Sequence, residues 1–260
     1  MRTVVVPDVH QRIDWVGRVL SAETTADEFV FLGDWLDSWS DAPGAASFED
    51  TCRYLRALSS LSPQSHRFVF LVGNHDMPYI YHNSSSSRSA VKGGDAYACS
   101  GFTRSKARIF RKVFYESGLR DGFFASRFAP AHFSQGVVMS HAGLHSTHLL
   151  PGESPEQMVT SRLREVWANF RNVNFPGNAL LSGCGTARGG TSAIGGVLWQ
   201  DWNAEFTPTA AIGRQIVGHT HSPEPSVRAM GTPSESWNID TGRDYAVIVD
   251  GRISTRRLPG

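Results

Sequence analysis

Five short apolar runs recur along the chain, and each stops at a polar motif. The runs occupy residues 3–6, 29–32, 68–72, 137–139 and 216–217. Continuous apolar runs of this kind, bounded by glycine or proline, are typical of strands buried on both faces. In open α/β folds such strands direct their carboxyl ends to a common edge, where ligands bind.

The segments between the runs carry helical spacing. Residues 13–20 and 52–58 each place apolar side chains on one helix face. A further helix is predicted from Ser154, because serine suits the N-cap, Pro155 the first turn and Gln157 the capping-box position. The alternation of strand and helix through residue 72 predicts a βαβ core.

Residues 82–122 interrupt this alternation. A serine-rich stretch at 83–88 predicts a loop, and a basic helix with an apolar stripe at 109–114 follows it. We therefore expect one domain over residues 1–260, with 82–122 inserted as a cap beside the site. The positive charge of this helix is either a solvated face or a surface that attracts anionic substrates.

Composition narrows the class of protein. Of the 260 residues 40% are hydrophobic and 19% are charged, as in ordinary globular proteins, and the net charge of +1 gives no signal for nucleic acid. No apolar run approaches the length of a membrane span, so no membrane partner is expected. An odd number of cysteines, three, without CxxC spacing suggests reduced thiols and a cytoplasmic location.

The motifs that follow the five runs are rich in oxygen and nitrogen metal ligands. They read Asp8-Val9-His10, Gly33-Asp34-Trp35-Leu36-Asp37, Gly73-Asn74-His75-Asp76, Ser140-His141-Ala142-Gly143 and Gly218-His219-Thr220-His221. A single histidine or aspartate after a strand is usually a cap or a hydrogen-bonded core group, and we interpret the other five histidines in this way. Five motifs in series are not explained by independent caps, so the sequence predicts a site for two metal ions at the sheet edge.

The order and spelling of these motifs resemble the calcineurin-like metallophosphoesterase superfamily, whose pattern is D-x-H, G-D-x-x-D, G-N-H-D/E, a lone histidine and G-H-x-H. Residues 140–144, 198–201 and 238–242 resemble its branch of serine/threonine phosphatases and bacterial dinucleoside tetraphosphate hydrolases. In that branch an arginine that grips phosphate usually follows the second aspartate. Here Ser38 follows Asp37, and Gln11 stands where the first motif usually ends in glycine.

The resemblance implies an α/β four-layer sandwich, in which two mixed β-sheets pack face to face between helices. It also implies two metal sites that share Asp34 as bridging ligand. Asp8, His10 and His221 would complete the first site, and Asn74, His141 and His219 the second. The mixed oxygen and nitrogen ligands suit divalent transition metals, manganese first and then iron, zinc, cobalt or nickel, better than calcium.

The resemblance further implies attack on phosphorus by a hydroxide that the two metals activate. His75 is similar to the family's proton donor to the leaving oxygen, and Asp37 would orient it. The amide of Asn74 could also donate to the phosphate. The arginines that could replace the missing phosphate clamp are Arg188 and Arg243, ranked first, and Arg88 and Arg214.

Three functions are compatible with these motifs. The first is a metal-dependent phosphomonoesterase, similar to a protein phosphatase, that acts on a small molecule, a nucleotide or a phosphoprotein. The second is a phosphodiesterase or dinucleoside polyphosphate hydrolase with the same site. The third, a non-catalytic scaffold, is disfavoured because the ligand motifs and His75 are intact.

Overall fold

The computed structural model describes residues 1–38, 44–61, 67–83, 99–116, 118, 121–169 and 178–258. All five apolar runs form strands. These are β1 (Arg2–Val6), β2 (Glu28–Phe31), β3 (Arg67–Leu71), β6 (Val137–Ser140) and β7 (Arg214–Val217).

The first sheet has six strands in the order β11-β10-β1-β2-β3-β4. Strands β1, β2, β3 and β4 (Phe128–Ala129) pair in parallel, so their carboxyl ends meet at one edge. Strands β10 (Asp244–Val249) and β11 (Arg252–Arg257) extend the sheet beyond β1 in antiparallel register.

The second sheet has five strands in the order β5-β6-β7-β9-β8. Its central strands β6, β7 and β9 (Ser236–Asn238) are parallel, whereas β5 (Ala131–Ser134) and β8 (Ser226–Arg228) pair antiparallel at the two edges. Both sheets are therefore mixed, as predicted.

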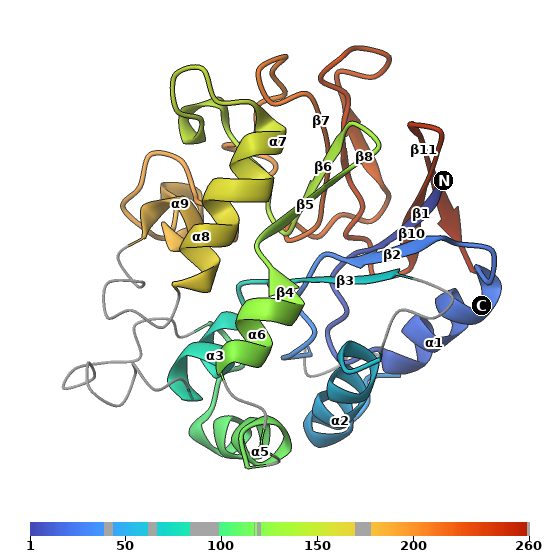
Figure 1. Ribbon diagram of the computed structural model, residues 1–260, viewed down its shortest axis with the longest axis vertical. Coiled ribbons are helices and arrows are strands. Elements are labelled where there is room, and N and C mark those ends of the chain that lie inside the picture. Colours follow the sequence, from blue (N-terminus) through green and yellow to red (C-terminus); the bar gives the residue numbers. More distant parts are fainter. Residues whose placement is uncertain are drawn as a thin grey trace.

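Alternation along β1 explains how the layers pack. Val5 points to an inner core shared with the second sheet, where it joins residues such as Met139 and Ile216. Val4 and Val6 belong instead to the outer core, together with apolar residues of the helices. Figure 1 shows this helical layer below β1, β2 and β3. It contains α1 (Ile13–Ala22), α2 (Phe48–Ser59), α3 (Met77–Asn83), α5 (Arg104–Phe114) and α6 (Asp121–Arg127).

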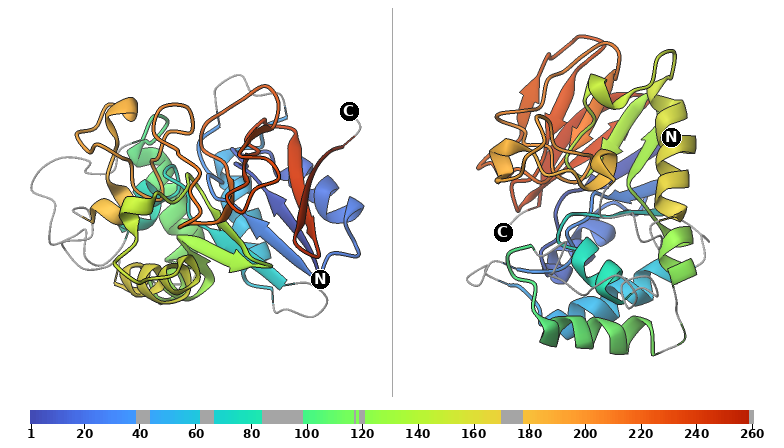
Figure 2. Two further views of the ribbon diagram at one scale, coloured as in Figure 1. Left: turned by 90° about the horizontal axis from the view of Figure 1, so that it is seen from above. Right: turned by 90° about the vertical axis from the view of Figure 1, so that its left-hand side faces the viewer.

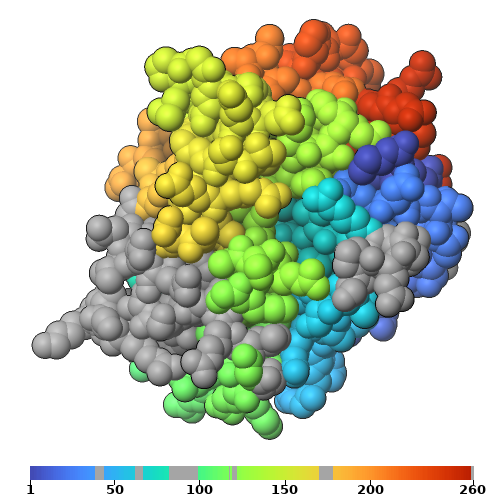
Figure 3. Space-filling view, in the orientation of Figure 1, coloured from blue at the N-terminus to red at the C-terminus, as the bar shows by residue number. Residues whose placement is uncertain are grey.

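A second helical segment lies beside β5 and β6. It runs through α7 (Pro155–Gln157), a π-helical turn at Met158–Arg162 and α8 (Leu163–Ala168), and Figures 2 and 3 show it in yellow at the surface next to the green strands. Its start confirms the predicted capping box. The side chain of Ser154 accepts a hydrogen bond from the backbone N–H of Gln157, and the side chain of Gln157 accepts one from the backbone N–H of Ser154. The predicted mixed α/β sandwich is confirmed.

The shorter helical elements lie in the long connections. They are 3-10 turns at Ser146–His148 and Thr186–Arg188 and the short helix α9 (Ala179–Ser182). Among the residues that the structure describes, no helix is long and apolar enough to cross a membrane.

The predicted cap region is described in part. Its basic helix is α5, which packs on α2 and α3 through buried residues that include Phe110 and Phe114. Most of the serine-rich stretch at 83–88 lies outside the described residues. The role of 82–122 as a cap stays a prediction.

Candidate metal centre

Each of the five central strands ends at one of the polar motifs. Because β1, β2 and β3 are parallel neighbours, as are β6 and β7, each sheet delivers its motifs to one edge. The side chains that meet there come from β1 (Asp8, His10), β2 (Asp34), β3 (Asn74), β6 (His141) and β7 (His219).

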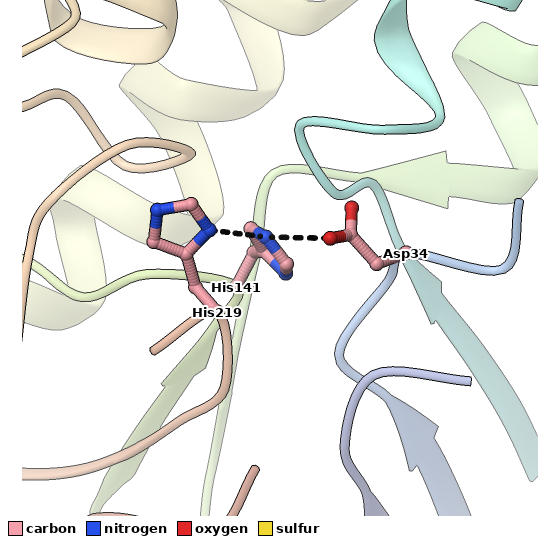
Figure 4. A group of neighbouring side chains, drawn as sticks. All are labelled: Asp34, His141 and His219. Atoms are coloured by element: carbon pink, nitrogen blue, oxygen red, sulfur yellow. Dashed lines mark hydrogen bonds and ion pairs between the residues drawn. The ribbon is translucent and has the colours of Figure 1, made fainter. Parts of the chain in front are cut away.

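One group of ligand atoms surrounds a common point. The Nε2 atom of His141 lies 2.8 Å from Oδ1 of Asn74 and 3.1 Å from Nδ1 of His219. Nδ1 of His219 lies 2.9 Å from the same Asn74 oxygen, and Oδ2 of Asp34 lies 3.5 Å from His141 Nε2. Figure 4 shows how Asp34 and His219 approach His141 from opposite sides.

A second group adjoins the first through Asp34. The Nε2 atom of His10 lies 3.7 Å from Oδ2 of Asp34 and 3.9 Å from Oδ2 of Asp8. The other oxygen of Asp34 accepts a hydrogen bond of 2.8 Å from the backbone N–H of His75, which turns Oδ2 toward both groups. Asp34 therefore belongs to both sets of potential metal ligands.

The tautomers of two histidines are fixed by carbonyl oxygens. Nδ1 of His10 lies 2.7 Å from the carbonyl oxygen of Asp37, and Nδ1 of His141 lies 3.1 Å from that of Leu32. A carbonyl can only accept, so each Nδ1 carries the proton and each Nε2 offers its lone pair to the group. Hydrogen bonds of this kind orient metal-binding histidines.

Glycines allow the carboxylates to approach the backbone. A Cβ atom on Gly218 would lie 2.0 Å from Oδ1 of Asp8, and one on Gly73 would lie 2.1 Å from Oδ1 of Asp34. Several non-glycine residues of the motifs also adopt positive φ, among them Asp34 at 48° and His219 at 68°. Such conformations cost about 1–3 kcal/mol each and concentrate at functional sites.

Burial makes the centre electrostatically suited to cations. Asp8 is fully buried, and the loss of hydration raises its pKa to about 6. Burial, followed by the nearby charges of Asp8 and Asp76, raises the pKa of Asp34 well above its usual range. Burial lowers the pKa of His10 to about 4 and that of His141 to about 3, so these imidazoles are neutral and able to bind metal. Two adjacent sets of buried oxygen and nitrogen donors thus fit a pair of divalent cations.

The predicted catalytic pair lies beside the two groups. Nδ1 of His75 is 3.5 Å from Oδ2 of Asp37, and both side chains are buried. The ring of His75 meets that of His10 edge to face, with centroids 5.4 Å apart. His75 is therefore next to His10, a potential ligand of the second group, without contributing to either set.

The predicted ligand His221 lies outside both groups. Its side chain is 67% exposed, and its Nδ1 faces Oδ1 of Asp240 at 3.8 Å. The alternation expected of an extended G-H-x-H segment fails because His219 turns the backbone to φ 68°. Asp240 itself is buried. It raises the pKa of His221 through a hydrogen bond and its charge, and it only partly opposes the burial that lowers the pKa of His10.

The four candidate arginines have different surroundings. Arg188 approaches the centre: its Nη2 donates to Oγ1 of Thr220 at 2.7 Å, and its charge helps to lower the pKa of His219 after the larger effects of burial and of His141. Arg243 pairs with Glu224 at 2.6 Å, and its side chain is half exposed.

The other two are not brought to the centre. Arg214 begins β7, at the end of the strand away from His219, and donates to the carbonyl oxygens of Gly251 and Gln135. Arg88 lies outside the described residues.

Two supporting residues were not predicted. Asp76 accepts hydrogen bonds from the backbone N–H groups of Trp35 and Gly73 at 2.9 and 3.0 Å and so ties two ligand loops together. Cys99 lies against Asn74, whose amide nitrogen is 3.5 Å from its Sγ. The spacing of Asp76 within its motif hinted at its role, whereas nothing in the sequence pointed to Cys99.

Comparison with solved structures finds similar proteins at low identity. A metallophosphoesterase from Sphaerobacter thermophilus is 14% identical over 100% of this chain and 88% of its own, with a TM-score of 0.43. A putative diadenosine tetraphosphatase is 16% identical over 98% and 93%, with a TM-score of 0.41. The phosphoesterase Yfce from E. coli is 12% identical over the full length of both chains, with a TM-score of 0.40. Comparison with curated proteins finds no match.

The comparison with protein families gives the assignment. Residues 1–223 match the model of the calcineurin-like phosphoesterase family, a range that contains every motif residue of the centre. Members of this family depend on two metal ions, in agreement with the two adjacent sets of potential ligands found here. The chain belongs to the calcineurin-like phosphoesterase family and is a hydrolase that acts on phosphate esters.

Proposed function

We propose that the chain is a metal-dependent phosphomonoesterase, with a phosphorylated small molecule, nucleotide or phosphoprotein as substrate. The observation that carries this proposal is the position of the Asp37–His75 pair directly beside two sets of ligands that share Asp34. A hydrolase needs such an acid next to the metals, because an alkoxide leaves phosphorus slowly unless it is protonated.

In this proposal the ligand residues form two adjacent metal sites. Two divalent cations, when bound, supply Lewis acidity toward the phosphoryl oxygens and a water of lowered pKa. His10, Asp8 and Asp34 would hold one cation, and Asn74, Asp34, His141 and His219 would hold the other. We propose manganese as the resident metal, because the ligands mix oxygen and nitrogen and include no thiolate.

His75 acts as the proton donor. Because its Nδ1 faces Asp37, its Nε2 is the nitrogen that can give a proton to the leaving oxygen. The Asp37 carboxylate keeps the ring in this orientation. General acid catalysis of this type contributes about 10²–10⁴-fold to the rate.

Arg188 is the best-placed candidate for the phosphate clamp. Asp201 holds its Nε at 2.9 Å and Thr220 accepts from its Nη2, so the guanidinium is fixed before substrate binds. Thr220 directly follows His219, which places this charge at the edge of the second metal site. Arg243 is half exposed and pairs with the exposed Glu224, so its guanidinium is held less rigidly and it is the weaker candidate.

A substrate panel tests the proposal. Protein loaded with Mn²⁺ is offered p-nitrophenyl phosphate, bis(p-nitrophenyl) phosphate and diadenosine tetraphosphate, with His75→Ala as the matched control. We expect the highest kcat/KM on the monoester, and loss of that activity in the control and after chelation. A preference for the diester or the tetraphosphate would favour the alternative hydrolase, and no turnover by the metal-loaded protein would favour the scaffold.

A further inference from the structure

A partly buried ion pair joins helix α5 to the catalytic pair. Nζ of Lys106 lies 2.7 Å from Oδ1 of Asp37, and the side chain of Lys106 is only 28% exposed. The hydroxyl of Tyr79 donates to the same oxygen at 2.6 Å. Lys106 lies 69 residues beyond Asp37, and its position near the start of α5 is fixed because its backbone N–H donates to Thr103, the N-cap.

The two oxygens of Asp37 therefore have separate partners. Oδ1 accepts from Lys106 and Tyr79, whereas Oδ2 faces Nδ1 of His75. Two donors on one oxygen prevent the carboxylate from rotating and hold the other oxygen toward the imidazole. The same donors, together with His75, lower the pKa of Asp37 against the opposing effect of burial.

The surroundings of this pair are apolar and tightly packed. Nζ of Lys106 lies 5.5 Å from the centre of the Phe48 ring, and Phe48 packs on Tyr79. A Cβ atom on Gly101 would lie 3.0 Å from Cβ and Cγ of Asp37, so the loop before α5 closes over the aspartate. Charged hydrogen bonds are stronger in such surroundings than in water.

The contacts of Lys106 do not fit a phosphate ligand. Its ammonium group donates to Asp37 and, at 2.8 Å, to the carbonyl oxygen of Gly101, and it lies over the ring of Phe48. Direct contact with substrate would require at least one of these bonds to break. A role through Asp37 requires none of them to change.

We infer that Lys106 and Tyr79 are positioning residues, which hold the Asp37 carboxylate so that His75 is oriented as proton donor. The inference rests on the proposed function, because it assigns these residues to the protonation of the leaving oxygen. In this chain the positive charge next to Asp37 comes from a helix of the predicted cap region, and not from the residue that follows Asp37, which is Ser38.

Kinetics with two kinds of leaving group test the inference. A positioning defect should matter for glycerol phosphate, whose alkoxide needs a proton, and not for dinitrophenyl phosphate, whose phenolate leaves without one. We expect Lys106→Met and Tyr79→Phe to lower kcat on glycerol phosphate about 10-fold, the effect of one lost charged hydrogen bond, with KM unchanged. Lys112→Met, at an exposed position of the same helix, is the matched control and should leave kcat and KM unchanged on both substrates.

A spectroscopic measurement separates this inference from the proposed function. In Zn²⁺-loaded protein with ¹⁵N-labelled histidine, the Nδ1 proton of His75 should give a downfield resonance that His75→Ala removes. We expect it to shift or broaden in Lys106→Met and to stay in place in Lys112→Met. If the wild type hydrolyses neither ester, the proposed function fails and this resonance decides the inference alone.

Three results would overturn the inference. The first is an equal loss on both substrates, which means a general defect of the site. The second is a rise in KM without a fall in kcat, which means that Lys106 binds phosphate. The third is a His75 resonance that is missing in the wild type or identical in Lys106→Met.

Discussion

Replacement of Asp8 by asparagine should stabilise the metal-free protein while it prevents metal binding. Asp8 is fully buried, and its carboxylate oxygens accept from the backbone N–H of His219 at 3.0 and 3.2 Å. The side-chain oxygen of an asparagine can accept the same hydrogen bond. The substitution therefore removes one buried negative charge and leaves the packing of the loop intact.

The magnitude follows from the pKa of Asp8. Burial raises this pKa from 3.8 to about 6, a difference of about two pKa units or about 3 kcal/mol. The folded state binds the proton more tightly than the unfolded state, so the protonated group is stabilising below pH 3.8 and this contribution is lost as the pH rises through about 6. The loss of folding stability caused by ionised Asp8 reaches about half of its full value at pH 5 and nearly all of it at pH 8.

Urea unfolding of chelated protein at about pH 5 and about pH 8 measures the effect. We expect Asp8→Asn to be more stable than the wild type by about 3 kcal/mol at pH 8 and by about half as much at pH 5. Mn²⁺ at about 100 times Kd should then stabilise the wild type by about 2.7 kcal/mol and the variant much less. Asp14→Asn, at an exposed position of α1, is the control and should show neither effect. An Asp8→Asn advantage that does not grow with pH would refute the reasoning.

Three further predictions concern the same centre. Gly218→Ala should lower the bound metal measured by elemental analysis, because its Cβ would lie 2.0 Å from Oδ1 of Asp8; unchanged metal content would contradict the close approach described here. Arg188→Ala should raise KM for p-nitrophenyl phosphate about 10-fold, the cost of a charged hydrogen bond, whereas Arg243→Ala should leave KM unchanged; the reverse order would exchange their roles. Metal affinity from calorimetry should fall as the pH drops below about 6, because the raised pKa values of Asp8 and Asp34 make protons compete with metal; an affinity that is independent of pH would contradict those pKa values.

The sequence predicted the convergence of the ligands because strand direction is a strong local signal. Each apolar run ends where its motif begins, and parallel pairing brings carboxyl ends together. The residues of the two sets of ligands, such as Asp34 and His141, were therefore expected at one edge before the sheets were known. The glycines of these motifs serve the same convergence, because Gly73 and Gly218 let the carboxylates of Asp34 and Asp8 approach the backbone.

Contacts between distant side chains could not be predicted in this way. Lys106 contacts Asp37 from helix α5. The apolar stripe of this helix predicts that it is helical, but it does not predict where the helix packs relative to the sheets. His221, which the resemblance implied as a ligand, lies outside both groups, because the left-handed backbone of His219 prevents the two histidines from sharing a face as they would in an extended segment. Arg214, a lower-ranked candidate for the phosphate clamp, begins β7, whose other end carries the motif with His219.

The most direct test of the account is an anomalous difference map from crystals grown with excess Mn²⁺. The account predicts two manganese peaks about 3.5–4 Å apart, with Oδ2 of Asp34 within bonding distance of both. Asn74, His141 and His219 should surround one peak, and Asp8 and His10 the other. A single peak, or two peaks that do not share Asp34, would contradict it.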